Sequence, residues 1–271
     1  MDGFLLVDKP AGISSHDVVL RIRRERGEPR AGHAGTLDPI ATGLLLVALG
    51  RGVRLLEYLQ GLEKTYEVEI ELGTLTETDD REGAPRGRAP VPSRADLEAA
   101  AARLRGEIEQ RPPAYSAVKV AGKRLYRYAR EGTPVEAPAR RVTVSELSLL
   151  SYDPPRARFR VRGSKGLYVR SIARDLGGHV TELRRTAVGP FRVEDAGPEP
   201  LPAEAAVAHL PEVPLSPEEA EAFRNGRFVP RPVPGIVRVA AAGRFLGVGE
   251  PSGGGMKPAK VILPRPDGAA S

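Results

Sequence analysis

The strictest pattern in the sequence is an alternation of apolar and acidic side chains in residues 64–73. The apolar positions are Tyr66, Val68, Ile70 and Leu72, and the acids between them are Glu67, Glu69 and Glu71. Successive side chains of a β-strand point to opposite faces, so this segment predicts a strand with one face in a hydrophobic core. A second alternation, in residues 156–162, places four arginines on one face and Ala157, Phe159 and Val161 on the other. Two such strands constrain the chain to fold around a sheet with one covered face.

Capping and turn residues divide the rest of the chain into helices and further strands. Ser14 or Ser15 can begin a helix that ends at Gly27, and Ser93 with Asp96 can begin another that ends near Gly106. Further strands are predicted at residues 3–8, 44–49 and 142–151, and a further helix at residues 168–176. This irregular order predicts an α+β fold with a mixed, largely antiparallel sheet flanked by helices.

Residues 194–214 are rich in proline, alanine and acids, which predicts a domain boundary. We expect a large domain in residues 1–210, with an insertion at about 111–140, and a small β-rich domain in residues 214–265. The small domain is predicted to contain a helix at 216–225 and strands within 235–249 and 259–263. Residues 264–271 are predicted to be a frayed tail.

Composition excludes several classes of site. The chain has no cysteine, so disulfides, thiolate ligands and cysteine nucleophiles are excluded. Its four histidines are too scattered to predict a zinc site. No apolar run has the length of a membrane helix, and the first residues do not have the pattern of a signal peptide. We therefore expect a cytoplasmic protein without a membrane association.

The net charge of +6 is concentrated in two windows. Residues 111–130 hold six basic side chains and no acid, with Tyr115, Tyr126 and Tyr128 among them. Cations bind phosphates and aromatic rings stack on bases, so this window predicts a nucleic-acid contact; a solvated surface hairpin is the alternative. In residues 156–174 the alternating arginines either bind phosphates or are neutralised by the acidic face of residues 67–71.

A glycine-punctuated loop, residues 32–43, holds one acid and one histidine. Glycines let a backbone approach a ligand closely, and Pro39 favours an extended or turn conformation at Asp38. An Asp-Pro pair alone is ordinary turn chemistry. The whole loop, however, resembles the signature G-H-x-G-x-L-D-P-x-A-T-G of the TruB-type pseudouridine synthases.

Further motifs of that family follow in the same order along the chain. They are residues 8–15, 64–66 with Gly73 and 76–80, 110–119, 164–170 and 183–186, and residues 243–249 and 257–260 resemble a short PUA domain. The resemblance implies a pseudouridine synthase fold and isomerisation of uridine-55 in the T-loop of tRNA. This reaction replaces the N1–C1′ bond of uridine by a C5–C1′ bond, so it requires neither a metal nor an organic cofactor.

The resemblance also implies roles for individual residues. Asp38 is the catalytic carboxylate, Tyr66 stacks on the target base, and Arg170 pairs with Asp38. His33 is expected to help evert the base. The remaining residues are expected to bind the substrate: Lys9, Tyr168, Leu183 and Asp80 around the active site, and Lys119, Lys123 and Arg127 on the RNA. The alternatives are a core tyrosine at Tyr66, a phosphate contact at Arg170 and a loop-stabilising hydrogen bond at His33.

Two other functions are compatible with the same motifs. One is a synthase of the dyskerin type, which is guided by a separate RNA and has extended, lysine-rich ends. The other is a non-catalytic protein that binds or folds tRNA. The retention of Asp38, Tyr66 and Arg170 favours catalysis, with tRNA as the partner, and we expect a monomer that requires no protein partner.

Overall fold

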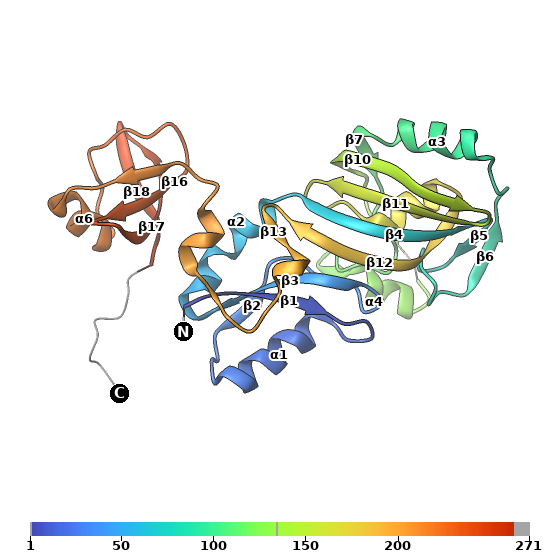
Figure 1. Cartoon of the computed structure of the whole chain (residues 1–271), viewed down its shortest axis with the longest axis horizontal. Coiled ribbons are helices and arrows are strands. Elements are labelled where there is room, and N and C mark those ends of the chain that lie inside the picture. The colour runs from blue at the N-terminus through green and yellow to red at the C-terminus, as the bar shows by residue number, and fades with distance from the viewer. Residues whose placement is uncertain (1, 134, 263–271) are drawn as a thin grey trace.

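The computed structural model describes residues 2–133 and 135–262. It has a large part built on a ten-stranded sheet and a small C-terminal part built on a four-stranded sheet (Figure 1). The predicted α+β class with a largely antiparallel sheet is confirmed, because among the neighbours in the large sheet only β3 and β12 run parallel within the described ranges. None of the described helices is long and apolar enough to cross a membrane.

The large sheet has the order β14-β1-β3-β12-β4-β11-β10-β7, with β2 beside β3 and β13 beside β12. Its strands are β1 Gly3–Lys9, β2 Ala31–His33, β3 Thr42–Leu49, β4 Lys64–Leu72, β7 Gly106–Gln110, β10 Arg140–Asp153, β11 Arg156–Gly163, β12 Gly178–Val188, β13 Phe191–Arg192 and β14 Leu201–Pro202. A separate hairpin pairs β5 Thr74–Thr76 with β6 Pro85–Arg88.

Strands β4 and β11 have the register that the two alternations require. Val161 pairs with Tyr66 and Arg160 with Glu67 across the two strands. The apolar face is buried in the main core, as predicted. The arginine face is neutralised by acids: Arg160 pairs with Glu67 at 3.3 Å, and ion pairs also form between Arg158 and Glu69, Arg158 and Glu182, and Arg162 and Glu63. The acidic face thus accounts for this strand without bound phosphates.

Three predicted helices cover the core side of the sheet. Helix α1 (Ser15–Arg26) begins at the N-cap Ser14 and ends at Gly27, which adopts φ +60°. Helix α3 (Arg94–Arg103) begins at Ser93 but ends before Gly106, which already belongs to β7. Helix α5 (Val169–Asp175) follows the β11–α5 turn. Their apolar faces join β4 and β11 in one cluster.

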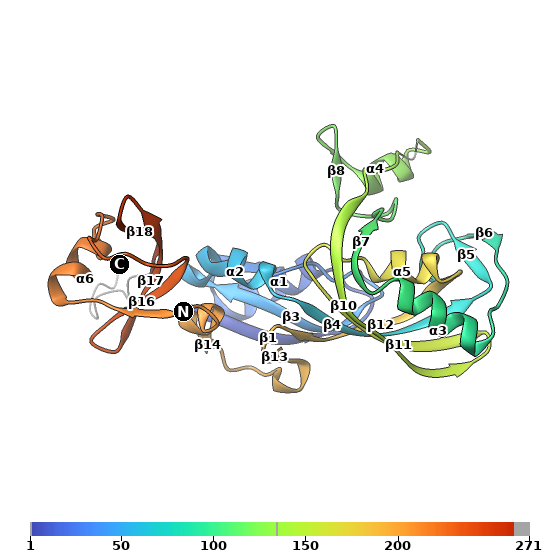
Figure 2. The same cartoon turned by 90° about the horizontal axis from the view of Figure 1, so that it is seen from above.

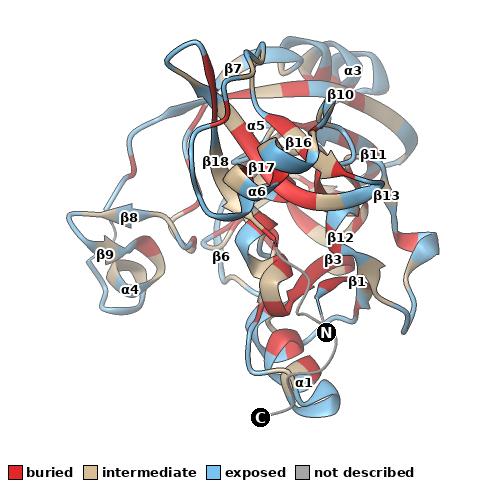
Figure 3. Ribbon diagram, turned by 90° about the vertical axis from the view of Figure 1, so that its left-hand side faces the viewer, coloured by how far each residue is buried: buried red, intermediate tan, exposed pale blue. Residues whose placement is uncertain are grey.

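The insertion between β7 and β10 projects from the body as an arm (Figure 2). It contains the short hairpin β8 Lys119–Val120 and β9 Lys123–Arg124, followed by helix α4 Leu125–Arg130. Leu125 is its buried apolar anchor, whereas most of its other side chains are exposed or half-buried (Figure 3). The basic window therefore lies on a protruding, solvated element.

Residues 194–214 are not an open linker. Strand β14 pairs with β1, and the 3-10 turns η2 Val193–Asp195 and η3 Ala203–Val207 pack near it. Strand β15 Glu212–Pro214 joins the small sheet.

The small sheet also contains β16 Val237–Ala241, β17 Arg244–Ser252 and β18 Gly255–Val261, and helix α6 Pro217–Arg224 lies beside it. Strand β18 begins earlier than expected, because Gly253 and Gly254 form the turn of a β17–β18 hairpin. Leu263 and the predicted tail lie outside the described residues.

The small domain docks on the 3-10 turn η1 Gly50–Leu55 and on helix α2 Leu56–Gly61. Leu59 shares a buried cluster with Val248 and Ile262. Lys260 forms an ion pair with Glu57 at 2.8 Å, and Arg54 donates to the carbonyl of Val261 at 2.7 Å. Apolar and polar contacts therefore both join the two parts.

Candidate active site

Asp38 lies on the loop between β2 and β3, at the edge of a cavity of about 440 Å³. The side chains of Leu37 and Ile40 anchor this loop in the core with 3% and 5% exposure. The amide of Ala41 donates to the carbonyl of Asp38 at 3.0 Å, which closes the turn expected at an Asp-Pro pair. The carboxylate itself keeps 36% of its side-chain surface exposed, so it is available to a ligand in the cavity.

Residues 9–15 hold this loop through hydrogen bonds to its backbone. Ser15 Oγ donates to the carbonyl of Leu37 at 3.0 Å and accepts from its amide at 2.8 Å, while the amide of Gly12 donates to the carbonyl of Pro39 at 2.8 Å. Lys9 is fully buried, and its Nζ donates to carbonyls of the same region, including Ile13 at 2.8 Å. Lys9 does not line the cavity, and its contacts with backbone carbonyls indicate that the ammonium positions the loop.

Arg185 braces the loop from the opposite side. Its side chain is 1% exposed and donates to the carbonyls of Leu44 at 2.7 Å, Gly35 at 3.2 Å and Thr36 at 3.5 Å. The approach depends on Gly43, where a Cβ would lie 2.2 Å from the carbonyl oxygen of Arg185. The sequence motif contained Arg185, but nothing in its position along the chain indicated this role.

Arg170 connects the Asp38 loop to two other segments. Its Nη2 lies 2.9 Å from Asp38 Oδ2, so the predicted ion pair is confirmed. Nη1 lies 3.4 Å from Asp80 Oδ2 and donates to the carbonyl of Thr78 at 2.8 Å, and Nη2 also donates to the carbonyl of Tyr115 at 3.0 Å. With 4% exposure, this guanidinium has few other orientations open to it.

Asp80 supports Arg170 from the β5–β6 hairpin loop. Its Oδ1 accepts from Thr78 Oγ1 at 2.5 Å and from the amide of Glu82 at 3.1 Å. The residue is 5% exposed and does not line the cavity beside Tyr66; it lines a neighbouring cavity of about 260 Å³. Asp80 is therefore placed to orient the guanidinium of Arg170.

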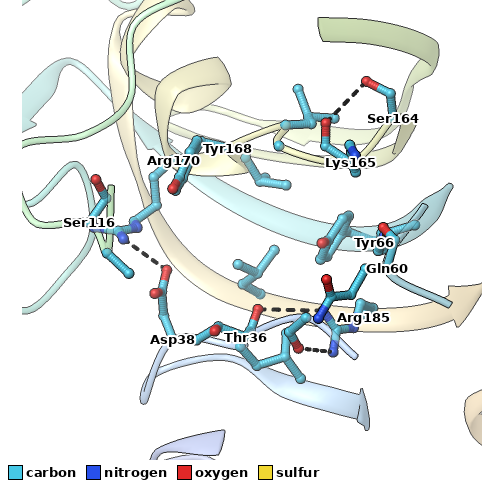
Figure 4. A pocket seen from close by; sticks show the side chains of 18 residues that line it. Thr36, Asp38, Gln60, Tyr66, Ser116, Ser164, Lys165, Tyr168, Arg170 and Arg185 are labelled. Atoms are coloured by element: carbon cyan, nitrogen blue, oxygen red, sulfur yellow. Dashed lines mark hydrogen bonds and ion pairs between the residues drawn. The ribbon is translucent and has the colours of Figure 1, made fainter. Parts of the chain in front are cut away.

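Tyr66, Tyr168 and Leu183 line the main cavity together with Asp38 and Arg170, as expected (Figure 4). The side-chain amide of Gln110 holds the backbone of Tyr168. Gln110 Oε1 accepts from the N–H of Tyr168 at 2.8 Å, and Gln110 Nε2 donates to the carbonyl of Tyr168 at 3.1 Å. Burial raises the pKa of the Tyr168 hydroxyl, so that group stays protonated at neutral pH. The positioning role of Gln110 was not predicted, because it joins residues far apart in sequence.

Besides Lys9 and Asp80, four further predicted contacts lie outside this cavity. His33 is half-buried on β2, its Nδ1 has no hydrogen-bond partner in the described structure, and burial lowers the pKa of its ring. Lys119, Lys123 and Arg127 lie on the arm. Lys123 pairs with Glu131 and lies 4.5 Å from the ring centroid of Tyr128, so its charge is partly offset.

The arrangement combines a fixed, half-exposed carboxylate with an aromatic wall in a cavity that can enclose a planar ring. Residues 23–169 match the family described as "TruB family pseudouridylate synthase (N terminal domain)". The chain belongs to the TruB family of pseudouridylate synthases. Residues 211–262 also match "Pseudouridine synthase II TruB, C-terminal".

Curated relatives align with nearly the whole length of this TruB chain. A protein named "tRNA pseudouridine synthase B" from Thermobifida fusca is 46% identical, with 96% of this chain and 98% of the relative covered. Its namesake from Aromatoleum aromaticum is 44% identical, with 97% and 93% covered. Among solved structures, that of a Cbf5-Nop10-Gar1 complex is similar with a TM-score of 0.74 and 25% identity, covering 97% of this chain and 85% of that one.

Proposed function

We propose that this chain is a tRNA pseudouridine synthase that isomerises uridine-55 of the T-loop, with Asp38 as its catalytic carboxylate. The observation that carries the proposal is the Asp38–Arg170 pair, 2.9 Å apart, at the edge of a cavity lined by Tyr66. The TruB relatives of 44% and 46% identity support tRNA as the substrate by their names. The T-loop and position 55 are supported by the family motifs.

In the proposed reaction the uridine is everted into the cavity, where the Tyr66 ring stacks on the uracil. Asp38 either attacks C1′ or removes a ribose proton, and Arg170 balances and aims its charge. The N1–C1′ bond breaks, the base turns, and C5 bonds to C1′. The C5 proton is lost and N1 gains one, so the reaction is an isomerisation without net oxidation or hydrolysis.

We propose roles for other predicted residues and for the two domains. His33 fills the space left by the everted base, and the arm with Lys119, Lys123 and Arg127 binds the tRNA backbone. Residues 1–210 form the catalytic domain, and residues 214–265 form a PUA-like domain that extends the RNA surface. We further propose that the enzyme acts in the cytoplasm as a monomer without a protein partner.

The two alternative functions are less well supported. A guide-dependent synthase is disfavoured because the relatives named tRNA pseudouridine synthase B are 44% and 46% identical, against 25% for the Cbf5 structure. A purely binding protein would not need Arg170 to hold Asp38 while Ser15 and Gly12 fix the neighbouring backbone of Leu37 and Pro39. A tRNA-folding activity is compatible with catalysis by the same cleft.

Mass-spectrometric mapping of a tRNA transcript after incubation with the protein tests the proposal. We expect one pseudouridine in the T-loop with the wild type and none with Asp38→Asn, while the Kd for tRNA changes less than threefold. Asp153→Asn, which removes an exposed carboxylate at the end of β10, is the matched control and should retain full activity. Turnover by Asp38→Asn, or no product with the wild type, contradicts the assignment.

A further inference from the structure

The cavity contains two buried cations that have no carboxylate partner. Arg185 is 1% exposed and Lys64 is 7% exposed. Arg185 donates only to carbonyls, and Lys64 Nζ donates to the carbonyls of Gln60 at 2.6 Å and Leu62 at 2.5 Å. Within the described parts of the chain, neither has an acidic oxygen within 4.0 Å. Carbonyls satisfy hydrogen bonds of these cations but do not cancel their charge, so both cations favour negative charge on a group that enters the cavity.

Both cations stand at the end of the cavity away from the Asp38–Arg170 pair. Lys64 precedes Tyr66 by two positions on β4, so the two side chains share a face, and Arg185 of β12 pairs directly with Tyr66 across the strands. Figure 4 shows Arg185 and Gln60 beside Tyr66, opposite Asp38 and Arg170. The cavity is therefore polarised, with the carboxylate at one end and the cations at the other.

An RNA substrate offers two kinds of negative charge. Its phosphates belong to the backbone, which stays outside the cavity when a base is everted into it. Lys165, an exposed lining residue, is available to them. The group that enters the cavity is the base. When the N1–C1′ bond breaks with its electron pair on the base, the charge spreads from N1 to O2 and O4. Buried cations beside Tyr66 are thus placed where negative charge develops, which is the condition for electrostatic catalysis.

We propose that Lys64 is a further catalytic residue of this reaction, a hydrogen-bond donor that stabilises the detached uracil anion, and that Arg185 is a positioning residue. The inference rests on the proposed function. An ammonium has three N–H donors, and the carbonyls of Gln60 and Leu62 occupy two, so one is left for a uracil oxygen. Lys64 keeps its protons throughout: C5 loses its proton and N1 gains one, as in the overall isomerisation.

The charge state of Lys64 gives this role a pH signature. Burial lowers the pKa of Lys64 to about 8, and the positive charges of Arg185 on β12 and Lys165 on the β11–α5 turn act in the same direction. The groups that face Lys64 from α2 and its C-cap residue are the neutral carbonyls of Gln60 and Leu62. As the pH rises above 8, free enzyme loses this cation, and kcat/KM should fall because it reports the ionisation of free enzyme.

The test compares Lys64→Met, Lys64→Arg and the wild type, with Arg94→Met on the exposed face of α3 as the matched charge-removal control. We expect Lys64→Met to lower the single-turnover rate at saturating enzyme by roughly 10²-fold, as for loss of one preorganised donor, with the Kd for tRNA within threefold of the wild type. Lys64→Arg should stay within about tenfold of the wild-type rate and keep its kcat/KM constant from pH 7 to 9.5.

Four results separate this inference from its alternatives. A single-turnover rate of Lys64→Met within threefold of the wild type overturns it, even though the proposed function would stand on the Asp38 result. A weaker Kd with an unchanged rate would make Lys64 a phosphate contact instead. A lowered rate that tracks a loss of thermal stability would make it a structural cap of α2. If Lys64→Met does not fold, identical pH profiles of Lys64→Arg and the wild type overturn the inference.

Discussion

The cavity around Asp38 and the arm of this TruB enzyme both carry basic side chains, but these are buried in the cavity and exposed on the arm. In the cavity, Arg170 is 4% exposed and is held by carboxylates and carbonyls, and Arg185 is 1% exposed and is held by carbonyls. On the arm, Lys119, Arg124 and Arg127 are exposed and have no carboxylate partner in the described structure. Buried cations act at short range and require fixed geometry, whereas exposed cations attract phosphates at long range and tolerate movement. We therefore expect mutations in the cavity to change the reaction rate and mutations on the arm to change the affinity for tRNA.

The sharpest test of the comparison is the replacement Arg170→Lys. A lysine keeps the charge but cannot contact Asp38, Asp80 and two backbone carbonyls at once, so we expect the single-turnover rate to fall roughly 10²- to 10³-fold. Single-turnover kinetics with labelled tRNA measure this loss, and a filter-binding Kd within threefold of the wild type should accompany it.

Arg174→Lys is the matched control for that variant. Arg174 lies on the same helix and pairs with Asp79 at 3.0 Å, but it does not contact Asp38. Its replacement should lower the rate less than fivefold. Equal losses in the two variants would mean that helix α5 requires arginine only for its packing.

An intermediate effect is expected for the arm variant that combines Lys119→Gln and Arg127→Gln. Each lost phosphate contact reduces the slope of log Kd against log salt by about 0.7–0.9, so the double variant should reduce it by about 1.5 and weaken binding roughly tenfold. The rate at saturating enzyme should be unchanged. Titrations at several salt concentrations test this, and an unchanged slope would reject the arm as an RNA contact.

The smallest effect is expected for Arg160→Gln on β11. Arg160 and Glu67 form an exposed ion pair on the face of the sheet opposite Tyr66, and such pairs contribute about 0–1 kcal/mol. We expect the salt slope and the rate to match the wild type, and the thermal midpoint to shift by less than about 4 °C. A slope reduced as on the arm would show that this strand also binds phosphates.

The two basic windows also show how far the sequence could be interpreted. The alternation of β4 and β11 predicted both strands and their buried faces, but only the register revealed that Glu67 faces Arg160. The family motifs placed Asp38, Tyr66 and Arg170 together correctly. The roles of Gln110 and Arg185 could not be predicted, because each depends on contacts with strands or loops 58 or more residues away.

Helix α2 has a consequence for any attempt to shorten this enzyme. Its residue Glu57 pairs with Lys260 of the C-terminal domain, and Leu59 belongs to the buried cluster that also contains Val248 and Ile262. Its carboxyl end presents Gln60 to the cavity, and the carbonyl of Gln60 accepts from Lys64. A truncation at residue 210 would therefore remove the partner of Glu57 and two members of the cluster that contains Leu59, and would leave this wall of the cavity without its outer support. Slower turnover in such a fragment would reflect a loosened pocket as well as a smaller RNA footprint.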